Sequence, residues 1–133
     1  MERRAYKRIV VDIESVFHLD DCNIVKREFV GLIEDISESG FKIVVDMHEY
    51  GSIVEQLDVG DKLSYTAIDT IADKITNEDV FLNGDAIVKR KVVEADNICL
   101  GCVFTNNIDE VSRYLNNKRV SIYLNKMRQG DVP

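Results

Sequence analysis

Short segments with alternating apolar residues fill most of this chain and constrain its fold more than any other feature. From Ile9 to Phe17 every second residue is apolar or small, while Asp12 and Glu14 occupy positions between them, as in a strand with one buried face. Comparable strand-like segments cover residues 24–36, 41–47, 59–68, 84–94 and 98–104, the first of them long or bulged and the third opening with a turn. About six strands with few helical interruptions predict one small antiparallel β-barrel.

The connections between these segments carry turn-forming residues. Ser37 to Gly40 separates two strands and predicts a hairpin, in which Gly40 supplies a positive φ. Turns are also expected at residues 20–23 and 95–97, and the polar stretch 69–79 has no clear periodicity and predicts a loop.

A helix is predicted after the last strand. Asn107 can serve as its N-cap, with Glu110 three residues later, so the helix should begin near Ile108. Two apolar stripes that are out of phase meet around Asn116 and Asn117, which indicates a break or shift there. We therefore expect a flexible basic arm with the start of the first strand over residues 1–12, a barrel over 9–105, and one or more C-terminal helices over 107–128.

Charge is unevenly distributed along the chain. The 133 residues have a net charge of −7, yet Arg3, Arg4, Lys7 and Arg8 lie within the first eight residues beside a single acid, Glu2. A broadly acidic surface repels nucleic acid and anionic membranes, whereas a local cationic cluster can hold a small anion. No stretch approaches the roughly 20 apolar residues that span a bilayer, so we expect a cytoplasmic protein with neither nucleic-acid binding nor membrane insertion.

Candidate metal ligands and catalytic groups are few. Three cysteines, Cys22, Cys99 and Cys102, form an odd set that predicts reduced thiols. Cys99 and Cys102 match a C-x-x-C spacing, but a zinc site needs about four ligands and His18 and His48 are not suitably spaced. No activated nucleophile is evident, and the paired acids Asp20-Asp21 and Glu34-Asp35 suit solvated turns rather than a cleft, so we expect neither a metal site nor an enzyme.

Two short motifs have the chemistry to bind a nucleotide. The arginines of the basic arm offer planar donor forks that match phosphate oxygens and stack on purines. Asp35 and Ser37 can accept from the N1–H and N2–H edge of guanine. Taken singly, each motif has a simpler interpretation, because a basic terminus is usually solvated and an Asp-Ser-Gly sequence usually closes a turn.

As an ordered pair, Arg3-Arg4-x-x-x-Arg8 followed by Asp35-x-Ser37-x-x-Gly40 between two strands resembles the PilZ domain family. Val59-Gly60-Asp61, Leu100-Gly101-Cys102-Val103-Phe104 and Tyr114-Leu115 resemble later landmarks of that family. The resemblance runs from Glu2 to about Leu115.

The resemblance implies a six-stranded split barrel and a bacterial receptor that binds the second messenger cyclic di-GMP, with no other cofactor. It implies that Arg4 and Arg8 contact phosphate and guanine, that Arg3 is auxiliary, and that the guanine site is shaped by Asp35, Ser37 and Gly40. Binding would order the arm and relay a signal to a downstream protein in control of motility, biofilm or exopolysaccharide. An adaptor with weak or no nucleotide binding remains the alternative, and whether the protein is a monomer or a homodimer stays open.

Overall fold

The structure is a computed structural model that describes residues 8–19, 27–69 and 80–128. Six strands and two helices follow one another along the chain. The strands are β1 (Ile9–Leu19), β2 (Arg27–Ile36), β3 (Gly40–Asp46), β4 (Lys62–Asp69), β5 (Val80–Val93) and β6 (Asn97–Phe104). The helices are α1 (Met47–Val54) and α2 (Ile108–Arg128). The expected turn at 20–23, the loop at 70–79, Cys22, Arg3 and Arg4 lie outside the described residues.

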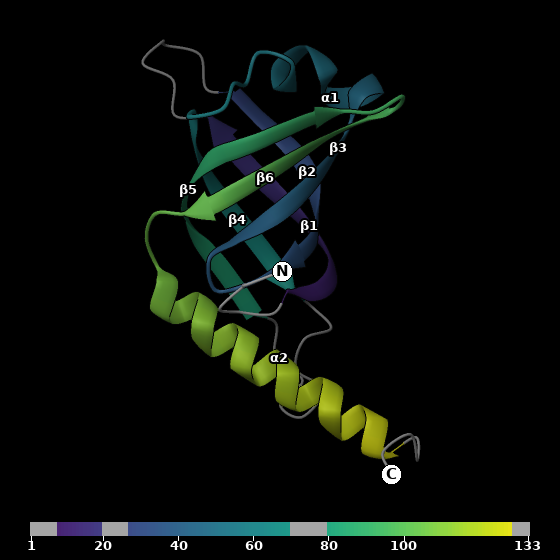
Figure 1. Cartoon of the computed structure of the whole chain (residues 1–133), viewed down its shortest axis with the longest axis vertical. Helices are drawn as coiled ribbons and strands as arrows, with labels where there is room; N and C mark the ends of the chain where they lie inside the picture. The colour runs from purple at the N-terminus through teal and green to yellow at the C-terminus, as the bar shows by residue number, and fades with distance from the viewer. Residues whose placement is uncertain (1–7, 20–26, 70–79, 129–133) are drawn as a thin grey trace, which may run out of the picture.

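The strands close into an antiparallel barrel in the order β1-β2-β3-β6-β5-β4, with β4 pairing back to β1. The six-stranded barrel expected from the sequence is therefore confirmed. Every neighbouring pair is antiparallel, which permits short connections such as the predicted hairpin between β2 and β3. Figure 1 shows β3, β6 and β5 side by side on the face toward the viewer.

An aromatic cluster fills the barrel. Phe41 lies 5.1 Å from Phe104 and 5.3 Å from Tyr65 between ring centroids, and Phe17 stacks on Phe29 at 5.1 Å. All five rings are buried, because alternate residues of each strand point inward. Burial of such large rings contributes strongly to the stability of this core.

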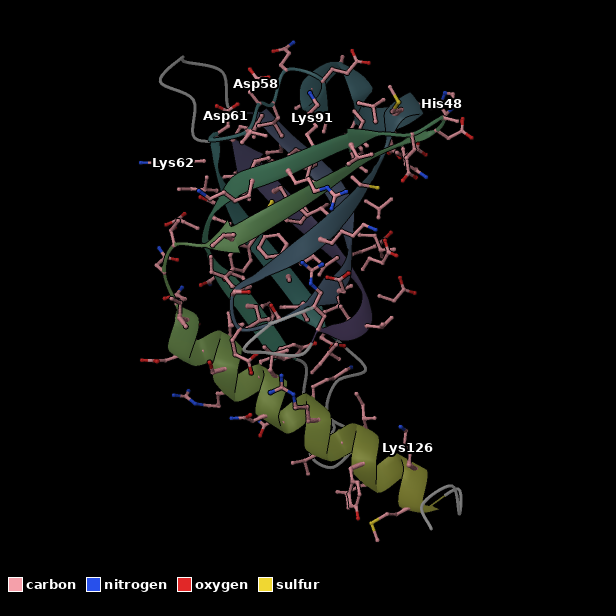
Figure 2. All side chains as sticks on the ribbon, viewed as in Figure 1. His48, Asp58, Asp61, Lys62, Lys91 and Lys126 are labelled. Carbon is pink, nitrogen blue, oxygen red and sulfur yellow. The ribbon has the colours of Figure 1, made fainter. Side chains whose placement is uncertain are left out.

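Helix α1 was not predicted. The strand expected to reach Met47 ends at Asp46, whose carboxylate accepts a 2.8 Å hydrogen bond from the His48 N–H and so caps the helix. Val54 of α1 is fully buried in the core, and Figure 1 shows α1 at the end of the barrel opposite α2. Lys91 of β5 donates to the carbonyls of Glu55 and Leu57, both at 2.8 Å, and Figure 2 shows its position beside α1.

Helix α2 begins at Ile108 as predicted, but the expected break at Asn116 and Asn117 is wrong, since the helix is continuous to Arg128. In the first stripe, Val111 and Leu115 pack on the barrel and are fully buried, whereas Ile122, further along the helix, is 37% exposed. The second stripe continues on the other side of the same helix, which explains why the two were out of phase. No helix within the described part of the chain is long and apolar enough to cross a membrane.

Candidate functional site

The corner between β2 and β3 is held by a compact set of hydrogen bonds. The Ser37 N–H donates to the Gly40 carbonyl at 2.8 Å, and the Ser39 N–H donates to Ser37 Oγ at 3.3 Å. Ser37 is almost fully buried, and its hydroxyl also lies 3.0 Å from Ser39 Oγ. The turn is thus fixed by its own serine side chains.

Gly40 is required at this corner for a reason other than the expected one. Gly60 is the only glycine with a positive φ among the described residues, so the predicted positive φ of Gly40 is wrong. A Cβ at Gly40 would instead lie 2.0 Å from the carbonyl oxygen of Cys102 on β6. Close approach of two backbones, not left-handed geometry, excludes a side chain here.

Arg8 and Asp35 bring the two sequence motifs together. The β1–β2 register pairs Val10 with Asp35, so Arg8, just before β1, reaches the end of β2. Arg8 Nη1 donates to Asp35 Oδ1 at 3.2 Å. The Arg8 side chain is 45% exposed and that of Asp35 19% exposed, so the guanidinium remains open to another anionic group.

A pocket of about 380 Å³ adjoins this corner on the outer surface of β3, β5 and β6. Four of the predicted residues line it: Arg8, Asp35, Ser37 and Gly40. Its volume is in the range typical of small-molecule sites. The other two candidate residues, Arg3 and Arg4, lie outside the described residues.

Three basic residues of the pocket, Lys42, Lys89 and Arg90, were missed by the sequence analysis. Gly101 of β6 pairs with Lys42 on one side and Arg90 on the other. Because neighbouring strands lie about 4.8 Å apart, two cations flank a position that has no side chain of its own. The register, which the sequence does not disclose, creates this arrangement.

A register shift in β5 adds the third cation. It falls between Val88 and Arg90, so Lys89 is an extra residue relative to β6, and both Lys89 and Arg90 are exposed. The basic run Lys89-Arg90-Lys91 in an acidic chain was the one available signal. Together with Arg8 and Lys42, these residues give the pocket a cationic rim suited to phosphate.

The cysteines of the C-x-x-C spacing are structural. Cys102 is part of the core, and burial raises the pKa of its thiol to about 12. Cys99 lies on the pocket wall, where desolvation also raises its pKa. Neutral thiols are poor metal ligands, and no group of three or more His, Cys, Asp or Glu in residues 8–19, 27–69 and 80–128 could hold a metal ion.

The corner is also tied to α2. Glu38, the residue after Ser37, accepts from Arg119 Nη1 at 2.8 Å and from Nη2 at 3.3 Å. This two-point contact lowers the pKa of Glu38 and raises that of Arg119. Glu38 and Arg119 are 81 residues apart, and nothing in the sequence indicated that they meet.

A second contact fixes the first half of α2 to the end of β4. Tyr114 Oη donates to Asp69 Oδ2 at 2.6 Å, and Lys118 Nζ donates to the same oxygen at 3.1 Å. Asp69 and Tyr114 are buried. The helix therefore has two polar attachments to the barrel, one at β4 and one at the motif corner.

Comparisons with known proteins identify the fold. The structure resembles the PilZ domain with c-di-GMP of YcgR from Escherichia coli, with a TM-score of 0.62, 16% sequence identity, and coverage of 99% of this chain and 100% of that one. It also resembles the MrkH–c-di-GMP complex of K. pneumonia (TM-score 0.68, 14% identity, 97% and 55% covered). A third similar structure is the Bacillus subtilis inhibitor of motility MotI/DgrA (TM-score 0.65, 12% identity, 91% and 53% covered).

The chain spans about half the length of MotI and MrkH, and at these identities the likeness concerns the fold. No curated protein matches significantly in sequence. The family model for the PilZ domain matches residues 2–117, which is most of the chain and includes both sequence motifs. The chain therefore belongs to the PilZ domain family.

Proposed function

We propose that this protein is a non-catalytic receptor for cyclic di-GMP, which binds in the pocket beside the β2–β3 corner. The ion pair between Arg8 and Asp35 carries the proposal, because it joins the two motifs at the rim of a cationic pocket. Two of the similar structures, those of YcgR and MrkH, are described with c-di-GMP. Cyclic di-GMP is a dianion with two guanines, so it needs both cations and acceptors for the guanine N–H groups.

Each group at the pocket suits one part of this ligand. Arg8, with Arg4 of the arm, would bind phosphate and stack on guanine, with Arg3 as an auxiliary contact. The Asp35 carboxylate would accept from the N1–H and N2–H groups of guanine once Arg8 turns to phosphate. Ser37 and Gly40 would hold the corner in shape, and Lys42 and Arg90 would add charge along β3 and β5.

The relay to a downstream protein would pass through α2. Ligand at the corner acts next to Glu38, and Glu38 holds Arg119 of the helix. A change in the turn therefore changes the restraint on α2, and a differential contact of this kind is what a ligand needs in order to shift a conformation. Control of motility, biofilm or exopolysaccharide would be the process served.

Isothermal titration with cyclic di-GMP tests the proposal. Arg8→Ala and Ser37→Ala should each weaken binding by about tenfold or more, because a hydrogen bond to a charged group contributes about 1.5–3 kcal/mol. Lys62→Ala is the matched control, since Lys62 is an exposed cation at a different surface and should leave affinity unchanged. Absence of saturable binding, or equal affinity in all variants, would favour the adaptor.

A further inference from the structure

The outer side of α2 has an apolar stripe that does not contact the barrel. Val120, Tyr123 and Met127 are 54%, 54% and 52% exposed, and their spacing places them on one side of a helix. At about 100° per residue, this side lies opposite Val111 and Leu115, which are buried against the barrel. Figure 1 shows α2 extending beyond the barrel, so the described strands leave the stripe open to contact with another molecule.

The charge around the stripe restricts what that molecule can be. Between Val111 and Arg128 the helix has no acidic residue, and its basic residues are Arg113, Lys118, Arg119, Lys126 and Arg128. Lys118 and Arg119 form ion pairs with Asp69 and Glu38 on the barrel side.

The other basic residues of the helix are available to a partner. Arg113 and Lys126 form no ion pair with any described residue, and Figure 2 shows Lys126 near the far end of α2. Two α2 helices packed stripe to stripe would face like charges, so the stripe fits an acidic, partly apolar surface.

The chain itself has such a surface on β1. Its outward row begins with Val10, which is 82% exposed, and continues with Asp12 and Glu14, both exposed. In the part of the chain that the structure describes, neither acid forms an ion pair.

The neighbouring strand β2 extends this surface. In β2, Leu32 pairs with Glu14 and Val30 pairs with Val16, and both Leu32 and Val30 are half-buried. Glu28 and Glu34 lie on the same side of β2, with side chains 55% and 46% exposed, beside His18 at 3.3 Å and Lys42 at 3.5 Å respectively. The acidic face, defined by Val10, Asp12, Glu14, Glu28, Leu32 and Glu34, thus matches the helix stripe in both apolar and charged character.

We infer that α2 of one copy docks on the acidic face of a second copy, with the contact exchanged reciprocally in a two-fold dimer. Reciprocal exchange repeats the same contact twice and closes the assembly, whereas a single head-to-tail contact would propagate. About two turns of helix on two strands bury less, in each of the two contacts, than the roughly 1,200 Å² of a standard interface. We therefore expect a dissociation constant on the order of micromolar and a strong dependence on salt. The inference does not depend on the proposed ligand.

Sedimentation equilibrium over a wide range of protein concentration, at low and high salt, tests it. The wild type should approach twice the monomer mass at low salt. Tyr123→Ala, Lys126→Glu and Asp12→Lys should each raise the dissociation constant about tenfold or more. Ile122→Ala is the matched control, because Ile122 is apolar and on α2 but outside the stripe, and it should leave the dimer unchanged.

The two charge reversals combined distinguish this contact from any other. A chain with both Lys126→Glu and Asp12→Lys restores opposite charges across the interface, so its dissociation constant should return to within about threefold of wild type. Circular dichroism and cyclic di-GMP titration of each variant show whether it is folded and whether the ligand site is intact. If the protein is a monomer at every concentration, the inference is wrong and the stripe would bind a different acidic protein. If it is a dimer whose dissociation constant does not change in any of the three single variants, the inference is wrong as well.

Discussion

Arg119 holds Glu38 through both guanidinium nitrogens, at 2.8 and 3.3 Å, and thereby connects α2 to the turn that carries Ser37 and Gly40. Glu38 has an 11% exposed side chain and Arg119 a 36% exposed one, so the pair is partly shielded from solvent. The contact links the pocket to the only long helix in the described chain.

Glu38→Gln should reduce the pH dependence of stability. Arg119 lowers the pKa of Glu38 in the folded state, so its stabilisation is present above the unfolded glutamate pKa of about 4.3. It is lost as pH falls through the lower folded value. We expect the variant to lose about 1 kcal/mol at neutral pH and less at acid pH, measured by urea unfolding at several pH values. Glu55→Gln, an exposed glutamate on the other side of the barrel, should follow the wild-type curve; equal curves for both variants would contradict the account.

Gly40→Ala and Gly101→Ala should have different effects. An added Cβ at Gly40 meets the Cys102 carbonyl at 2.0 Å, whereas at Gly101 it meets Arg90 Cβ at 3.3 Å. The first is a backbone collision and should cost about 3 kcal/mol or prevent folding. The second should change the melting temperature little but weaken cyclic di-GMP binding, because the new methyl group occupies the gap between Lys42 and Arg90. Thermal unfolding and titration of the two variants measure both effects, and a reversed order of stability would count against the pocket geometry.

Arg90→Ala should weaken cyclic di-GMP binding by about tenfold and reduce its dependence on salt, because a cation near the phosphates is removed. Arg90→Lys should recover only part of the affinity, since an ammonium provides charge without a planar donor fork. Titration at two salt concentrations measures both quantities. Full affinity in Arg90→Ala would place the ligand away from β5.

Removal of a buried hydroxyl should destabilise the fold at one tyrosine and not at another. Tyr114 donates to Asp69 at 2.6 Å, so Tyr114→Phe should destabilise the fold by about 1–2 kcal/mol. The Tyr65 hydroxyl is buried without a hydrogen-bond partner among the described residues, and Tyr65→Phe should be neutral or stabilising. Urea unfolding compares them, with exposed Tyr123→Phe as the control. Destabilisation by Tyr65→Phe equal to that of Tyr114→Phe would show that the hydroxyl has a partner.

The barrel and the motif corner were predictable because both rest on local sequence. Alternation from Ile9 to Phe17 determines which face is buried, and the residues from Asp35 to Gly40 form a turn through their own side chains. Helix α1 was missed because it is only eight residues long, although Asp46 followed three residues later by Glu49 has the spacing of a helix start. The continuity of α2 was not predicted because its two apolar stripes lie on different sides of one helix.

The remaining features depend on contacts between residues distant in sequence. The contact between Glu38 and Arg119 joins the β2–β3 turn to the C-terminal helix, and no local sequence pattern predicts it. The cationic pair Lys42 and Arg90 exists only because both strands pair with Gly101 in one register. Register follows from turn lengths and bulges that a single sequence leaves open.

The most direct test of the central claim is a titration of isotope-labelled protein with cyclic di-GMP, followed by amide chemical shifts in NMR spectra. The account predicts saturable shifts centred on the corner from Asp35 to Lys42 and on the pocket residues of β5 and β6, with smaller shifts at Arg119. GMP at the same concentration should produce much weaker changes, because it has one guanine and one phosphate. No saturable shifts, or shifts confined to the opposite side of the barrel, would contradict a cyclic di-GMP site at the meeting point of Arg8 and Asp35.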